Sequence, residues 1–162
     1  MLKPLRRLSL FFPCVLVFLL SGCLPTQELY VGNKVTVEQV PLERNAAQSG
    51  TWQTFDITID YNFVAKGDVL EISGQAVLGD HQRMVYDIIR SLDIYLFFLD
   101  DDSRVLLTEP LNQTLTGSTE QTAFFSYSYN IPDGTRSLSF GYSGEVTEQE
   151  GQMYFYQLPL TK

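Results

Sequence analysis

The chain has 162 residues and a formal net charge of −8. Its length suits one ordinary domain with a real hydrophobic core, and its aromatic content of 13% argues against general disorder. The excess of acidic side chains repels phosphate backbones, which disfavours nucleic-acid binding.

The first 22 residues have the layout of an export signal. Three basic residues precede an apolar run over residues 8–20, and two small residues follow it. A positive segment, an apolar segment and a small-residue end are the three parts of a secretory signal. A membrane helix needs roughly 20 apolar residues to cross a hydrocarbon core of about 30 Å, so a cleaved signal fits this run better.

The apolar run ends at Leu20-Ser21-Gly22-Cys23. These four residues resemble the lipobox of bacterial lipoproteins, in which a small-residue pair precedes an acylated cysteine. The resemblance implies cleavage before Cys23, a lipid on its thiol and attachment to a membrane of the cell envelope. Leu24, in place of an aspartate, implies the outer membrane, facing the periplasm, if the host has two membranes. The alternative is a plain secretory signal followed by a chance cysteine.

Removal of residues 1–22 leaves 140 of the 162 residues. Three of the 11 basic residues leave with the signal, so eight remain against 19 acidic ones, a balance near −11. Cys23 is the one remaining cysteine, so a disulfide within the domain is excluded and stability must come from the core. We expect a tether over residues 23–50 that can carry one edge strand at 34–40, followed by a domain over 51–162.

Alternation of apolar and polar residues predicts the strands of this domain. Residues 52–64 place Phe55, Ile57, Ile59, Tyr61 and Phe63 on one face, and residues 69–78 return as the second strand of a hairpin. Further strands are predicted over 92–99, 104–108, 122–131, 135–147 and 153–160, with a weak edge strand near 113–116.

Seven or eight short antiparallel strands favour an all-β, two-sheet sandwich. The rhythm is similar to immunoglobulin-like and fibronectin-III-like domains. The Cys–Trp–Cys arrangement of true immunoglobulins is missing, so the resemblance concerns architecture alone. A small barrel is the alternative fold.

Residues 80–90 interrupt this rhythm. The spacing of Met84 and Ile88 fits a short helix, and an extended crossover to the next strand fits almost as well. The segment is more apolar than a solvated loop needs, and loops on a rigid sandwich often carry binding residues. Met84 and Tyr86 are therefore candidate partner-binding residues, with coverage of an open end of the core as the alternative.

Asp100, Asp101 and Asp102 form the densest acidic cluster. Calcium takes about 6–8 oxygen ligands, but the cluster lacks the later Gly and Glu of an EF-hand loop. Aspartates also stabilise turns by bonding their own backbone, so a solvated hairpin turn is the preferred interpretation. The single histidine, His81, stands without a nucleophile motif or the partners of a zinc site, and we predict neither catalysis nor a cofactor.

The predicted function is binding. We expect a non-catalytic module for protein–protein interaction or assembly in the cell envelope. The alternative is a carbohydrate-binding module, because tyrosines on an open sheet face could stack against sugar rings, although tyrosines more often pack the core. Aromatic clustering on an exposed face would favour a glycan, whereas an exposed apolar patch or a free strand edge would favour a protein partner.

Overall fold

The computed structural model describes residues 30–80, 88–111, 122–148, 151–157 and 160–161. The predicted export signal and Cys23 lie outside these ranges, as do Met84, Tyr86 and the weak edge strand at 113–116. In the described ranges there is no helix long and apolar enough to cross a membrane.

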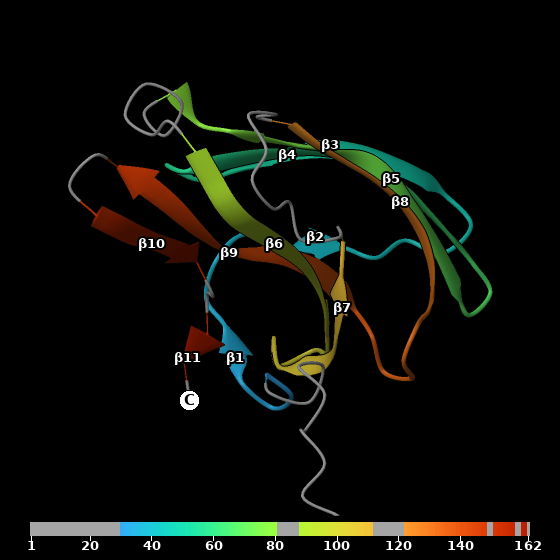
Figure 1. Ribbon diagram of the computed structural model, residues 1–162. Coiled ribbons are helices and arrows are strands. Elements are labelled where there is room, and N and C mark those ends of the chain that lie inside the picture. The colour runs from blue at the N-terminus through green and yellow to red at the C-terminus, as the bar shows by residue number, and fades with distance from the viewer. Residues whose placement is uncertain (1–29, 81–87, 112–121, 149–150, 158–159, 162) are drawn as a thin grey trace, which may run out of the picture.

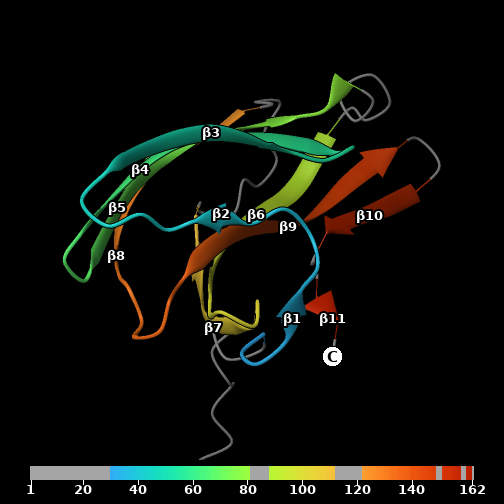
Figure 2. The ribbon, with the colours of Figure 1, turned by 180° about the vertical axis from the view of Figure 1, so that it is seen from behind.

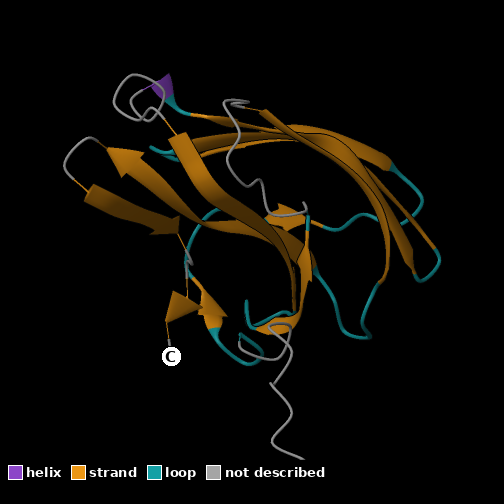
Figure 3. Ribbon diagram, in the orientation of Figure 1, coloured by secondary structure: helices purple, strands orange, loops and turns teal. Residues whose placement is uncertain are grey.

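Eight strands form two antiparallel sheets of four strands each (Figures 1 and 3). The first sheet has the order β3-β4-β5-β8, with β3 at Ala47–Gln53, β4 at Ile57–Lys66, β5 at Val69–Leu78 and β8 at Thr122–Asn130. The second has the order β10-β9-β6-β7, with β6 at Ile88–Leu99, β7 at Val105–Pro110, β9 at Ser137–Glu148 and β10 at Gly151–Gln157. The predicted all-β sandwich is confirmed.

Three short strands complete the described structure. β2, Val40–Pro41, pairs with β9, and β1, Lys34–Val35, pairs with β11, Leu160–Thr161. Seen from behind, the chain runs from β1 through β2 beside β9 and then crosses into β3 of the first sheet (Figure 2). The N-terminal part of the described chain therefore connects the two sheets.

The strand order agrees with the immunoglobulin-like arrangement. When the strands from β4 onward are lettered in chain order, the neighbours β4-β5-β8 in the first sheet correspond to strands A-B-E of an immunoglobulin sandwich. The neighbours β10-β9-β6 in the second sheet correspond to strands G-F-C. β7 lies beside β6 as strand C′ lies beside strand C. β3 is an additional strand that pairs with β4 at the edge of the first sheet.

One core lies between the sheets. It contains Trp52, Ile57, Ile59, Phe63, Leu70 and Ile72 from the first sheet and Leu92, Ile94, Leu96, Phe98, Leu138 and Phe140 from the second. Aromatic rings join the two sheets, with Phe140 5.2 Å from Tyr61 and 5.8 Å from Trp52, measured between ring centroids. Burial of these apolar surfaces is the main favourable term for the fold.

The predicted strand over 52–64 is two strands joined by a tight turn. The Thr54 hydroxyl accepts the backbone N–H groups of Asp56 and Ile57, and the Thr54 N–H donates to the Ile57 carbonyl at 2.9 Å. Phe55 stands at the tip of this turn and is 75% exposed, whereas Ile57 and the rest of the predicted apolar face are buried. The two-residue tip changes the core-facing positions from the even-numbered Trp52 in β3 to the odd-numbered Ile57 in β4, so Phe55 does not belong to the buried face predicted for it.

The residues predicted as a tether include structured chain. Val35 packs with Phe97, Leu99 and Val105 in a second, smaller core on the outer face of the β6 sheet. The ring of Tyr30 lies 5.8 Å from that of Phe97, in an edge-to-face contact. Backbone hydrogen bonds from Gly32 to Val105 and from Val35 to Ser103, both 2.8 Å, fasten this segment. The single edge strand predicted at 34–40 is replaced by two short strands near its two ends, β1 at Lys34–Val35 and β2 at Val40–Pro41.

β6 is the central strand of its sheet, as predicted for residues 92–99, because it pairs with both β9 and β7. Residues 88–90, at the end of the segment predicted as a helix or crossover, belong to β6. The hairpin predicted over 52–64 and 69–78 is the β4–β5 pair, with Ile57 opposite Leu78 and Lys66 opposite Val69.

Candidate functional site

The acidic cluster forms the turn between β6 and β7. Asp100 Oδ1 accepts the backbone N–H groups of Asp102 at 2.9 Å and Arg104 at 2.8 Å, and Ser103 takes a φ of 64°. This pattern matches the hairpin-turn interpretation, because an Asp carboxylate bonded to the following backbone stabilises a turn. Within the described ranges, no group of three or more His, Cys, Asp or Glu side chains is placed to hold a metal ion.

Tyr142 belongs to the core and links the two sheets. Its hydroxyl donates to Asp56 Oδ2 at 2.6 Å and accepts from Thr54 Oγ1 at 3.1 Å, so β9 is joined to the β3–β4 turn. Burial, reinforced by the hydrogen bond to Asp56, raises the pKa of Tyr142. Tyr61 is buried as well, and these two residues match the core interpretation of the tyrosines.

Tyr127 and Tyr129 lie on β8. Tyr129 is partly buried and donates its hydroxyl to the Pro110 carbonyl, which ties β8 to the end of β7. The ring of Tyr127 stacks on that of Tyr129 at 5.7 Å and an interplanar angle of 22°. Tyr127 is 36% exposed, so one face of this aromatic pair reaches solvent.

The hydrogen-bonding pattern shows which backbone groups of β8 face outward. The Ile131 N–H donates to the Asp68 carbonyl at 2.8 Å, and this pair continues the register in which Ser126 lies opposite Ser73. Antiparallel residues alternate between hydrogen-bonded and non-hydrogen-bonded pairs. The odd-numbered residues of β8 therefore bond to β5. The N–H and C=O groups of the even-numbered residues point to the open edge: Thr122, Phe124, Ser126, Ser128 and Asn130.

This open edge lacks the usual protection against strand pairing. Exposed edges are commonly blunted by charges, prolines, bulges or short length. β8 spans nine residues with the sequence Thr-Ala-Phe-Phe-Ser-Tyr-Ser-Tyr-Asn, without a charge or a proline, and its register with β5 is unbroken. Phe124 on the outer face is 77% exposed. Among the described strands, none pairs with the outer side of β8.

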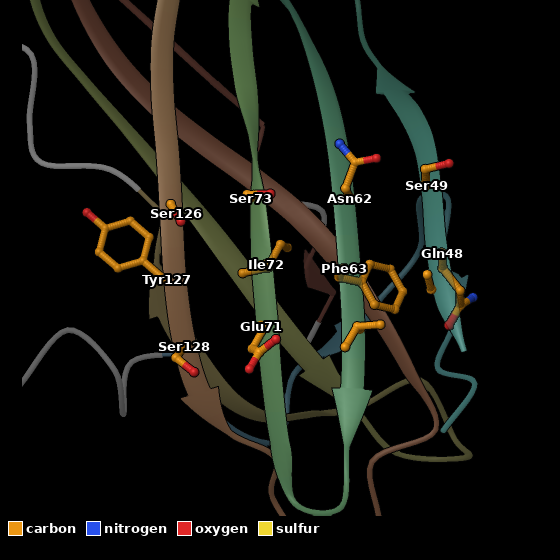
Figure 4. Close-up of a pocket in the computed structure, with 12 residues that line it drawn as sticks. Gln48, Ser49, Asn62, Phe63, Glu71, Ile72, Ser73, Ser126, Tyr127 and Ser128 are labelled. Atoms are coloured by element: carbon orange, nitrogen blue, oxygen red, sulfur yellow. The ribbon is translucent and has the colours of Figure 1, made fainter. Parts of the chain in front are cut away.

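A hollow of about 700 Å³ lies on the β3-β4-β5-β8 sheet (Figure 4). Its lining includes the four residues Ser49, Asn62, Ser73 and Ser126, which stand opposite one another across the four strands. Phe63 and Ile72 also border it, but both are buried in the core. Gln48 and Tyr127, in the same row as Phe63 and Ile72, are partly accessible. The remaining lining residues, Ala47, Val64, Glu71 and Ser128, form the next row on the outer face.

The next row across the sheet contains an oriented carboxylate. Thr51 Oγ1 donates to Asp60 Oδ1 at 2.7 Å, and Gln75 Nε2 donates to Asp60 Oδ2 at 3.2 Å. Both hydrogen bonds lower the pKa of Asp60, and the one from Thr51 has the larger effect. Asp60 is therefore negatively charged at neutral pH. Phe124 lies opposite Gln75 and completes this row.

No family model, curated protein or solved structure matches this chain. The open edge of β8 and the hollow therefore carry the functional argument. Sequence reasoning missed both. The absence of charge over residues 122–130 could have pointed to the edge, but the position of β8 within the sheet depends on pairing with a distant strand.

Proposed function

We propose that this protein is a lipid-anchored, non-catalytic binding module of the bacterial cell envelope, and that it binds an extended segment of an envelope protein along β8. The open, uncharged edge of β8 carries the proposal. A partner strand at such an edge bonds to main-chain groups, which supply affinity, while neighbouring side-chain contacts supply specificity.

The edge offers both kinds of contact. Even-numbered residues from Thr122 to Asn130 direct N–H and C=O groups outward, by the alternation described above. Phe124 and Tyr127 are exposed on either side of this strand and can pack against the partner's side chains. A partner strand without acidic residues fits best, because the exported chain would carry a charge near −11.

The anchor would keep the domain close to the membrane. Tyr30 packs on the second sheet and lies seven residues after Cys23. Seven extended residues reach at most about 25 Å. With a lipid on Cys23, the segment 30–35 and the adjoining β6–β7 turn would stay within that distance of the lipid surface. A protein of the same membrane is therefore the partner that this arrangement favours.

A proline at Ser126 tests strand addition. The Ser126 N–H faces the open edge, so Ser126→Pro removes an outward donor without breaking the β5 ladder, a placement that edge strands tolerate. We expect the melting temperature to change little and the crosslinked partner, recovered from native membranes, to be lost. Ser126→Thr keeps the N–H and should retain the partner. Recovery of the same partner by a folded Ser126→Pro variant would refute binding at this edge.

A further inference from the structure

The hollow has a structural cause in the sizes of its side chains. Ser49, Asn62, Ser73 and Ser126 are small or short and form one row across the sheet. The row on one side consists of Thr51, Asp60, Gln75 and Phe124, of which Gln75 and Phe124 have longer side chains than the row of small residues. The row on the other side consists of Ala47, Val64, Glu71 and Ser128, which also line the hollow. The row of small residues is therefore the floor of a trough that the row with Gln75 and Phe124 bounds on one side and the longer Glu71 side chain bounds on the other.

The polar side chains on the floor of this trough are available to form hydrogen bonds with a ligand. Among the described residues, the side chains of Ser49, Asn62, Ser73 and Ser126 have no hydrogen-bond partner. Three hydroxyls and one amide can both donate and accept, which matches a ligand that carries hydroxyl groups of its own. An apolar ligand would leave these groups without partners, at a cost in affinity.

The charges around the trough exclude one class of ligand. Asp60 stays ionised and is held in position by Thr51 and Gln75. Lys66 is paired with Glu71 at 2.8 Å, so the charges of these two side chains offset each other. A phosphate or carboxylate ligand would meet a net negative surface, whereas a neutral hydroxyl group can donate to Asp60.

Phe124 adds an apolar contact at one end. It is the next outward side chain along β8 from Ser126, and 77% of its surface is exposed. Successive outward residues of a strand lie about 7 Å apart, so this ring stands beside the trough. The apolar face of a sugar ring can pack on such an aromatic side chain while its hydroxyl groups meet the polar floor.

We propose that this trough is a binding site for a neutral saccharide chain. A hollow of about 700 Å³ is in the size range of small-ligand sites, roughly 300–1,000 Å³. The floor would bond the sugar hydroxyls, Asp60 would accept from one of them, and Phe124 would contact a ring face. This site is separate from strand pairing at β8, because its floor lies mainly on β3, β4 and β5.

The test uses the protein purified in detergent from the membranes that contain it. Binding is screened on an array of neutral and anionic oligosaccharides, and the best neutral one is titrated. Asn62→Ala and Ser73→Val each remove floor groups and should weaken binding about tenfold, the usual effect of one hydrogen bond. Thr58→Val removes a hydroxyl from the same sheet face, two rows away, and should change affinity less than about twofold.

The outcomes separate this site from the proposed protein-binding edge. Asn130→Pro removes an outward N–H of β8 at a residue outside the hollow, so it should weaken the protein crosslinks and leave saccharide binding in place. Asn62→Ala should leave the protein crosslinks in place. The saccharide site is refuted if neutral oligosaccharides fail to bind at about 1 mM, or if both floor variants bind as the unaltered protein does. Preferential capture of anionic glycans or of a basic peptide in the trough would also overturn it.

Discussion

Val35→Ala should destabilise the domain, although Val35 lies in a segment with the composition of a tether. The side chain is 2% exposed and packs with Phe97, Leu99 and Val105. The substitution removes two methyl groups, worth about 0.8 kcal/mol each in transfer, and leaves a cavity that adds to the loss. We expect the free energy of unfolding to fall by about 2–3 kcal/mol, equivalent to roughly 6–15 °C in melting temperature for a domain of this size.

Urea unfolding followed by tryptophan fluorescence measures this effect. Trp52 is the only tryptophan and is buried in the main core, so its emission reports unfolding of the sandwich. Val31→Ala is the matched control, because Val31 is 50% exposed and lies in the same short segment. Its effect should stay within about 0.5 kcal/mol.

Equal and small effects of the two substitutions would refute this reasoning. A loss below about 0.5 kcal/mol for Val35→Ala would mean that the segment contributes no packing energy to the domain. The domain would then begin near β3. The conclusion that only seven residues separate Cys23 from the folded domain would fail.

Three further predictions concern the anchor, the core and the acidic turn. Cys23→Ala should abolish acyl-lipid labelling, and labelling at the unaltered level would contradict the lipobox assignment. Burial and the hydrogen bond to Asp56 raise the pKa of Tyr142, so its contribution to stability is complete below the unfolded tyrosine pKa of about 10 and is lost as pH rises above it. Tyr142→Phe should therefore flatten the fall of melting temperature above about pH 10, and an unchanged slope would assign that fall to other groups. A chelator should leave the melting temperature unchanged, because the Asp100 carboxylate is bonded within its own turn; a marked decrease would instead support calcium at Asp100, Asp101 and Asp102.

Much of the sandwich was predictable from the period of its strands. The alternation of Ile57, Ile59, Tyr61 and Phe63 identified a buried face correctly, because a strand with one solvated side must alternate. Local sequence patterns predicted the turns and the short strands less accurately. The apolar Phe55 at the tip of the Thr54 turn continued the odd-numbered pattern of β4 and hid a strand boundary. The edge strand predicted at 34–40 is two separate short strands, β1 and β2.

The candidate sites depend on long-range pairing that the sequence does not reveal. β8 is an edge because it pairs with β5 alone, and Ser73 is a neighbour of Ser126 only through that register. Each residue of the trough, taken singly, has the appearance of an ordinary solvent-facing strand residue. Their alignment across four strands gives the surface its shape.

Photo-crosslinking in intact membranes tests strand binding at β8 most directly. A benzophenone amino acid replaces Ser128, whose backbone groups face the open edge, and in a second variant it replaces Thr58 on the same sheet. If a partner binds along β8, position 128 should give one discrete protein adduct that disappears when Ser126→Pro is added, and position 58 should give none of that mass. Absence of an adduct at 128, or the same adduct from both positions, would contradict binding along this edge.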